Sequence, residues 1–318
     1  MLTARLVPVS DGTVQSALST QQYHLAGSDG AIWQDIDGSG ILSLAVTPAV
    51  DSTAIVSGNV DLWTATAGYN QDIGINVAEV DPSIYPGNIV AWKESGGWAG
   101  TFSPNAAFIQ TVLPLTHGVS YHIKLQWKAN KNARGASIYA GAGPWPSAGT
   151  AYSPSRLTVQ LAPATERPLT AVSYSQFVLS NSDGNTWADL RDSTGTPLSL
   201  TFTPTASCMT IISGNVDLWT ANAGINQDIG IYVSPWSSPG NIVAWKESGG
   251  YAGTFSPNAA FVQTTIELTG GTPYTVKLVW KANRNAAGKS IFAAAGPWPT
   301  GAAAFSPTRL AAQFKACS

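Results

Sequence analysis

Short stretches in which apolar and polar residues alternate run along most of the chain. In the stretch YTVKLVWKA, for example, Val276, Leu278 and Trp280 alternate with Lys277 and Lys281. A period of two residues is typical of a β-strand with one buried face. The stretches are separated by turns rich in Gly, Pro and Asn. The pattern therefore predicts an all-β protein made of short strands.

The pattern occurs twice, because long segments of the first half recur in the second half. SGNVDLWTATAGYNQDIGI (57–75) returns as SGNVDLWTANAGINQDIGI (213–231). GNIVAWKESGGWAGTFSPNAAFIQT (87–111) returns as GNIVAWKESGGYAGTFSPNAAFVQT (240–264). A repeat of this length is a whole domain and not a solenoid unit.

The sequence thus predicts two tandem homologous antiparallel β-sandwich domains, jelly-roll-like, over 1–160 and 161–318. Immunoglobulin-type sandwiches are the alternative, but the repeat is longer than their roughly 100 residues. The segment SPNAAF predicts a short helical turn capped by Ser103. A closing-strand motif at 2–8 resembles 157–163, and either remains from a longer array or pairs as an extra strand.

The run GGTPYTVKLVWKAN…IFAAAG…SPTRLAAQF resembles the closing strands of jelly-roll modules. The shared pattern is a Tyr-x-Val-x-Leu strand, a loop, a strand of small residues and a Leu-rich final strand. Such modules include the C1q/tumour-necrosis-factor type, and related ones occur in phage tail fibres and carbohydrate-binding domains. The resemblance implies a sandwich that can trimerise and implies no chemistry.

Charge and composition narrow the classes of partner. Only 11% of residues are charged, the net charge is −2, and no run of Lys or Arg exists, which argues against nucleic acid. No apolar stretch approaches the roughly 20 residues of a membrane span. The N-terminus lacks the apolar core of a signal peptide; the compartment stays open, and the composition is compatible with an extracellular protein. Cys208 and Cys317 either form one bridge or are two idle thiols, and they exclude a disulfide scaffold.

Twelve tryptophans are a high count for this chain, and most occur in pairs across the two halves. Trp127 and Trp280 lie in alternating strands, so we expect them in the cores. Trp145 and Trp298 are flanked by proline in GPWP turns, which do not fit a regular strand. They are either rigid, exposed rings for stacking on sugars or plugs for one end of each sandwich.

A second set of candidates is a cluster of amide, carboxylate and ammonium groups that also occurs in both halves. Such groups can pair with neighbouring sugar hydroxyls. The alternative is architectural, because Asn and Asp terminate strands and cross-strand Lys–Glu pairs are common. The candidate ligand-binding residues are Asn70, Asp72, Lys93, Glu94 and Lys128 in the first half, and Asn226, Asp228, Lys246, Glu247 and Lys281 in the second.

Signatures of catalysis and of metal binding are weak. Asp72 with Glu94, and Asp228 with Glu247, are possible carboxylate pairs for a glycosidase. None of the three histidines recurs in the second half, and no nucleophile elbow, phosphate loop or dinucleotide motif is present. Asp61 with Asp72 is a candidate calcium site without the usual loop. We expect neither a metal nor a cofactor.

Three functions fit these observations. The first hypothesis is a non-enzymatic, lectin-like carbohydrate-binding protein with two equivalent sites, which gain avidity from duplication. The first alternative is a self-assembling surface or fibre protein, and a homo-oligomer fits it. The second alternative is a carbohydrate-active enzyme that uses an Asp/Glu pair.

Overall fold

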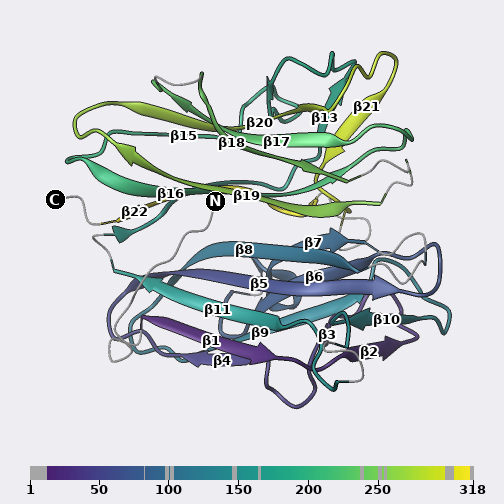
Figure 1. The fold of residues 1–318 in the computed structure, drawn as a ribbon. Helices are drawn as coiled ribbons and strands as arrows, with labels where there is room; N and C mark the ends of the chain where they lie inside the picture. Colours follow the sequence, from purple (N-terminus) through teal and green to yellow (C-terminus); the bar gives the residue numbers. More distant parts are fainter. Residues whose placement is uncertain are drawn as a thin grey trace.

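The computed structural model describes residues 13–81, 83–96, 100, 104–144, 149–163, 166–236, 240–249, 253, 256–297 and 304–315. These residues form two antiparallel β-sandwich domains, one from each half of the chain (Figure 1). They contain no α-helix, and the short 3-10 segment η2 (Pro86–Asn88) precedes one of the strands. The all-β prediction of two tandem jelly-roll-like sandwiches is confirmed. The boundary at residue 160 stays a prediction.

Each domain has two sheets, and the strand order of the first domain recurs in the second. Sheet A has the order β1-β11-β5-β10-β2, with β8 also paired to β5. Sheet B has the order β3-β9-β6-β7, with β4 also paired to β9. The strands are β1 (Val14–Ser19), β2 (Tyr23–Ala26), β3 (Gln34–Asp35), β4 (Ser43–Val46), β5 (Ser52–Thr64), β6 (Gln71–Val77), β7 (Ile89–Ser95), β8 (Asn105–Leu115), β9 (Tyr121–Ala129), β10 (Ser137–Ala140) and β11 (Ser155–Ala162).

The second domain repeats this arrangement in sheets C and D. Sheet C has the order β12-β22-β16-β21-β13 with β19 on β16, and sheet D has the order β14-β20-β17-β18 with β15 on β20. The strands are β12 (Leu169–Ser173), β13 (Phe177–Ser180), β14 (Ala188–Asp189), β15 (Ser199–Phe202), β16 (Cys208–Trp219), β17 (Gln227–Ser234), β18 (Ile242–Ser248), β19 (Asn258–Leu268), β20 (Tyr274–Ala282), β21 (Ser290–Ala293) and β22 (Thr308–Lys315).

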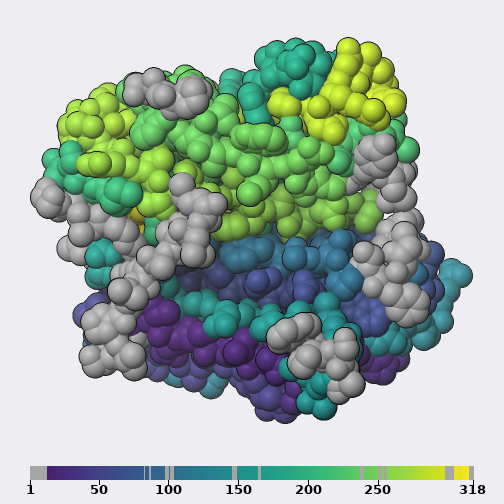
Figure 2. Space-filling model, viewed as in Figure 1, coloured from purple at the N-terminus to yellow at the C-terminus, as the bar shows by residue number. Residues whose placement is uncertain are grey.

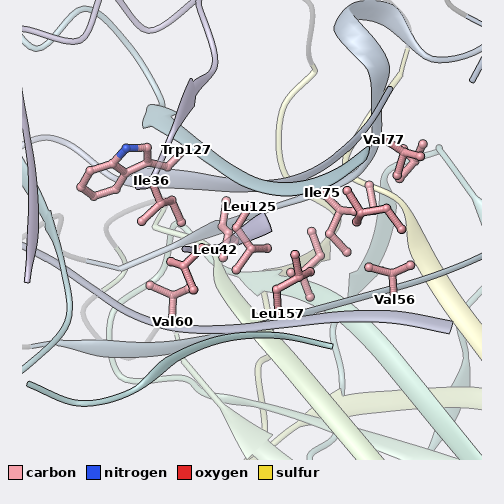
Figure 3. Packing of buried hydrophobic residues seen from close by; sticks show 14 of the residues in the cluster. Ile36, Leu42, Val56, Val60, Ile75, Val77, Leu125, Trp127 and Leu157 are labelled. Atoms are coloured by element: carbon pink, nitrogen blue, oxygen red, sulfur yellow. The ribbon is translucent and has the colours of Figure 1, made fainter. Parts of the chain in front are cut away.

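The alternating apolar residues of both sheets meet inside each sandwich. In the first core, Val56 and Val60 of sheet A face Ile75 and Leu125 of sheet B (Figure 3). The sheets approach closely at Gly58, where an added Cβ would lie 2.6 Å from Leu125 Cδ2. Glycine is therefore required by space at this point of β5.

Trp127 and Trp280 fill the two cores with 1% and 2% of their surface exposed, as predicted. The helical turn expected at SPNAAF is wrong. β8 begins at Asn105 and pairs with β5 along its whole length. Pairing with a neighbouring strand overrides the local capping signal here. Ser103 lies outside the described residues, as does the closing-strand motif at 2–8.

The two domains pack against each other with sheets A and C facing, and we call this contact the interdomain seam (Figures 1 and 2). At its centre, β8 lies beside β19, and equivalent residues of the two copies touch. The rings of Phe108 and Phe261 are 4.0 Å apart between centroids, and Asn105 Nδ2 lies 3.5 Å from Asn258 Oδ1. Like residues meet along this line, but the contacts beside it are one-sided: β7 docks on the second domain, whereas the exposed part of β18 does not dock on the first.

Candidate functional site

The predicted polar residues form one row across three neighbouring strands in each domain. In sheet B, Asp72 of β6 lies directly opposite Glu94 of β7 on one side and Lys128 of β9 on the other. In sheet D, Asp228 lies in the same way between Glu247 and Lys281. Directly opposed residues project from the same face of a sheet. The structure therefore brings three of the candidate residues together in each copy, and their role in binding a ligand stays a prediction.

In the first domain the row is tied together by buried contacts. Lys128 Nζ forms an ion pair with Asp72 Oδ2. Glu94 Oε1 accepts hydrogen bonds from Asn70 Nδ2 at 2.6 Å and from Asn130 Nδ2 at 3.1 Å. Lys93 is the next residue in the strand, so its side chain leaves the opposite face of β7. Lys93 thus lies outside the row.

The second domain makes the same contacts at nearly the same distances. Lys281 Nζ lies 2.5 Å from Asp228 Oδ2. Glu247 Oε1 accepts from Asn226 Nδ2 at 2.7 Å and from Asn283 Nδ2 at 3.2 Å. The geometry is duplicated together with the sequence.

The surroundings of the two rows differ, because the seam covers the first one. The Lys93 ammonium donates to the backbone carbonyl of Pro307, and the Glu94 amide donates to Asp217 Oδ2 at 3.3 Å. Trp92, on the same face as Glu94, packs in one cluster with Ala295. All three partners belong to the second domain, so β7 is an edge strand closed off by the neighbouring domain.

Burial at the seam shifts the ionisation of this first copy. Burial raises the pKa of Glu94 to about 8, and the nearby Asp72 and Asp217 charges add to the rise. Burial also raises the pKa of Asp217 to about 6 and lowers that of Lys93 to about 8, each partly opposed by the charge of the other. These groups hold two domains together and are closed to a substrate.

The second copy is open. Trp245 is 55% exposed, whereas its counterpart Trp92 is 5% exposed. Lys246 and Glu247 are exposed as well. We call the outer face of sheet D around Trp245 and Glu247 the sheet D face; Lys246, like Lys93, leaves the opposite face of its strand.

Trp187 extends the sheet D face beyond the polar row. Its ring lies over Gly230, where an added Cβ would come within 3.1 Å of it, and it meets Trp245 edge-on at 6.4 Å between centroids. The Lys281 ammonium lies 5.3 Å from the Trp187 ring centroid, within cation–π range. A hollow beside Trp187 continues to Asp189 and Arg191, which form an ion pair at 2.5 Å.

Several sequence predictions receive no test here. Trp145 and Trp298 lie outside the described residues, and so does Cys317; Cys208 is buried. The described part of the chain holds no group of three His, Cys, Asp or Glu side chains placed to bind a metal ion. No helix within it has the length and apolarity needed to span a bilayer.

Sequence reasoning missed the residues that distinguish the two copies. The seam residues of the second domain have identical counterparts in the first: Asn215 corresponds to Asn59, Asp217 to Asp61 and Pro307 to Pro154. No sequence signal shows which of the two sets is buried at the seam. Trp245 could have been found, because it lies two residues before Glu247 in a strand and so shares its face.

Comparison with known proteins adds little beyond the fold. No protein-family model matches the chain, and no curated protein matches it. Among solved structures, a peptide-N(4)-(N-acetyl-β-D-glucosaminyl) asparagine amidase is 10% identical, covers 96% of this chain and 98% of its own, and has a TM-score of 0.38. Recombinant peptide:N-glycanase F is 10% identical over 95% and 96% of the two chains, with a TM-score of 0.39.

A particle of infectious bursal disease virus, Gx strain, is 13% identical over 96% of this chain and 76% of its own, with a TM-score of 0.25. Likenesses at these scores concern the fold alone. None of these structures is a C1q/tumour-necrosis-factor module or a tail fibre, so those particular resemblances find no support.

The hypothesis of a non-enzymatic, lectin-like protein with two equivalent sites is wrong. The two sites are not equivalent: residues identical in sequence are buried under a domain in one copy and exposed in the other. Avidity from two matching sites therefore has no basis in this molecule.

Proposed function

We propose that this protein is an enzyme that hydrolyses a carbohydrate-bearing substrate at one site, the sheet D face of the second domain. The observation that carries the proposal is the exposed carboxylate of Glu247 beside the exposed ring of Trp245. The equivalent residues of sheet B, Glu94 and Trp92, are buried. The first copy of the row serves as structure, and the second is free to bind.

Substrate recognition rests on the two tryptophans. Trp245 presents a large flat apolar face to solvent, and Trp187 holds it edge-on. The apolar C–H face of a sugar ring can stack on such a surface. Around it, Asn226 and Asn283 each have a second amide proton besides the one given to Glu247, and these protons can pair with hydroxyl groups.

Chemistry rests on Glu247, the carboxylate of the row that is exposed. Two amide donors hold its Oε1, which leaves Oε2 directed to other partners. In this proposal Glu247 touches the substrate and transfers a proton in the hydrolytic step. Asp228 lies opposite Glu247 on the neighbouring strand, is paired with Lys281 and is a positioning residue.

The test is turnover of labelled oligosaccharides and of an N-linked glycopeptide by the intact chain. We expect Glu247→Gln to lower kcat by about 100-fold or more, because a positioned acid or base contributes roughly 10²–10⁴-fold. Trp245→Ala is expected to act mainly on KM.

Glu94→Gln is the matched control, since it makes the same change in the sealed copy and should leave the rate unchanged. The proposal fails if no substrate of either class is cleaved, or if Glu94→Gln costs as much as Glu247→Gln.

A further inference from the structure

The interdomain seam is built from two complementary halves, and each domain carries both. One half is an edge strand with the sequence Trp-Lys-Glu. The other is an acceptor surface formed by an Asp carboxylate, an Asn side chain, a Pro carbonyl and an Ala methyl group. In the structure, β7 of the first domain docks on the acceptor surface of the second, which consists of Asn215, Asp217, Ala295 and Pro307.

The sequence also contains the opposite combination, an edge strand in the second domain and an acceptor surface in the first, and these two do not meet in the structure. β18 carries Trp245, Lys246 and Glu247, all exposed. The first domain carries the same acceptor residues at equivalent positions, Asn59, Asp61, Ala142 and Pro154. Asn59 is exposed and Asp61 is half-buried, whereas Asn215 and Asp217 are buried.

Equivalent residues meet at the centre of the seam, and this decides how the unused halves are related. Phe108 touches Phe261 and Asn105 touches Asn258. If the two domains exchanged places in the seam, Phe108 would still touch Phe261 and Asn105 would still touch Asn258. The same exchange would replace the contact between Lys93 and Pro307 by a contact between Lys246 and Pro154. It would also replace the hydrogen bond from the Glu94 backbone N–H to Asp217 by one from the Glu247 backbone N–H to Asp61.

We propose that the two domains have a second docked arrangement, in which β18 closes on Asn59, Asp61, Ala142 and Pro154 of the first domain as β7 now closes on the second domain. The two arrangements share the Phe108–Phe261 line and exclude each other. A second copy of the chain cannot supply the partner by the same geometry, because the surface around Phe261 is already covered by Phe108.

The free energies of the two arrangements differ little in the contribution from buried polar and charged residues. The present arrangement buries Lys93, Glu94 and Asp217, and burying charges costs free energy that their pairing offsets only in part. The reverse arrangement would bury the same three residue types. One feature of the present arrangement involves Arg309: burial lowers the pKa of its guanidinium, and Tyr174 of the second domain and, to a smaller extent, Tyr85 of the first domain oppose this shift.

The segment that carries Tyr85 explains why the present arrangement is the favoured one. The connection before β7 has 11 residues (78–88), whereas the connection before β18 has 7 (235–241). Ser238 aligns with Tyr85 across the shared sequence PGNIV. The first domain therefore brings one extra side chain to the seam that the second cannot offer.

The test uses thiol pairs in the full-length chain with Cys208→Ser and Cys317→Ser, the first of which restores the residue found at Ser52. Pair one, Lys93→Cys with Pro307→Cys, bridges the observed contact. Pair two, Lys246→Cys with Pro154→Cys, bridges the proposed one. Pair three, Lys93→Cys with Pro154→Cys, joins positions that neither arrangement brings together. Each is treated with a short thiol-bridging reagent, and intramolecular bridging is measured by peptide mapping.

We expect pair two to bridge at least several-fold faster than pair three. Asp217→Asn should accelerate pair two, because it weakens only the present arrangement, and Asp61→Asn should slow it. Asp61 is half-buried and unpaired with the second domain, so this variant keeps the fold even if Asp217→Asn does not. Bridging of pair two no faster than pair three, and unmoved by Asp61→Asn, would overturn the proposal.

The second arrangement would also cover Trp245 with Ala142, as Ala295 now covers Trp92. This consequence rests on the proposed function: a carbohydrate bound to the sheet D face would slow the bridging of pair two. The bridging test itself needs no carbohydrate, so its outcome is independent of whether the enzyme proposal holds.

Discussion

Glu94 and Glu247 occupy the same place in the same strand and accept the same two amide hydrogen bonds. Their difference lies in solvent, because only Glu94 is sealed beneath a second domain. A buried carboxyl group close to Asp72 and Asp217 favours its protonated form. The hydrogen bond from Asn70 and the charge of Lys128 oppose this shift of the pKa without cancelling it.

The raised pKa of Glu94 predicts how stability depends on pH. The folded protein holds the Glu94 proton up to about pH 8, whereas the unfolded chain releases it near the usual 4.5. The folded state therefore binds more protons across this window, and the stability contributed by Glu94 is lost as the pH rises through it. We expect Glu94→Gln, which mimics the protonated group, to be more stable than the wild type above about pH 8 and similar to it near pH 5.

Urea unfolding at a series of pH values measures this effect. Glu247→Gln is the control and should keep the wild-type slope, because Glu247 is exposed. An unchanged slope in Glu94→Gln would show that the carboxyl group is ionised inside the seam.

At the scale of elements, strands β7 and β18 share the sequence IVAWKES but differ in surroundings. Every residue of β7 is buried, whereas the centre of β18 is exposed. Both are edge strands of their own sheets, so the difference comes entirely from the neighbouring domain. A strand sequence therefore does not determine its own burial.

The tryptophans in these strands give a direct measure of that difference. Trp92→Ala should lower the free energy of unfolding by roughly 3–5 kcal/mol, as expected for removal of a buried Trp. Trp245→Ala should cost about 1 kcal/mol, mainly its edge contact with Trp187. Chemical denaturation of the two variants compares them, and equal costs would contradict the one-sided seam.

The alternating pattern predicted the sheets well, because it is set by contacts within each sandwich. Val276, Leu278 and Trp280 point inward as their spacing indicates, and the row of Asp228 with Glu247 and Lys281 follows from strand pairing. The helical turn at SPNAAF failed because β8 continues through it to pair with β5. Burial of Glu94 could not be predicted, since identical residues in the two halves carry no information on which one meets the other domain.

At the scale of the whole molecule, Asn215 is a central link across the seam. Its Oδ1 accepts a hydrogen bond from the backbone N–H of Gln110 at 3.1 Å. Its Nδ2 donates to the backbone carbonyls of Phe108 at 3.0 Å and Ala260 at 3.1 Å. The counterpart Asn59 is exposed. The same amino acid thus binds two domains together in one half of the chain and faces solvent in the other.

Removal of this link should weaken the association of the domains. We expect Asn215→Ala to cost about 2 kcal/mol or more, because it leaves buried partners without hydrogen bonds. The two halves should also unfold in separate steps. Asn59→Ala should change the unfolding midpoint little. Calorimetry of both variants checks this, and similar thermograms would argue against Asn215 as a link.

The one-sided seam beside Phe108 and Phe261 bears on how the two halves of the chain have diverged since the duplication. Because the seam is closed on one side, it uses only half of the residues that are duplicated for it. The other half is not needed to hold the domains together and can be substituted without loss of the seam. The outer strands show such drift, since VQSALS in β1 has become LTAVS in β12. The Trp-Lys-Glu triplet of β18 and the Asn59–Asp61 surface opposite it have not drifted. The open side of this molecule is therefore as well preserved between the two halves as the closed side.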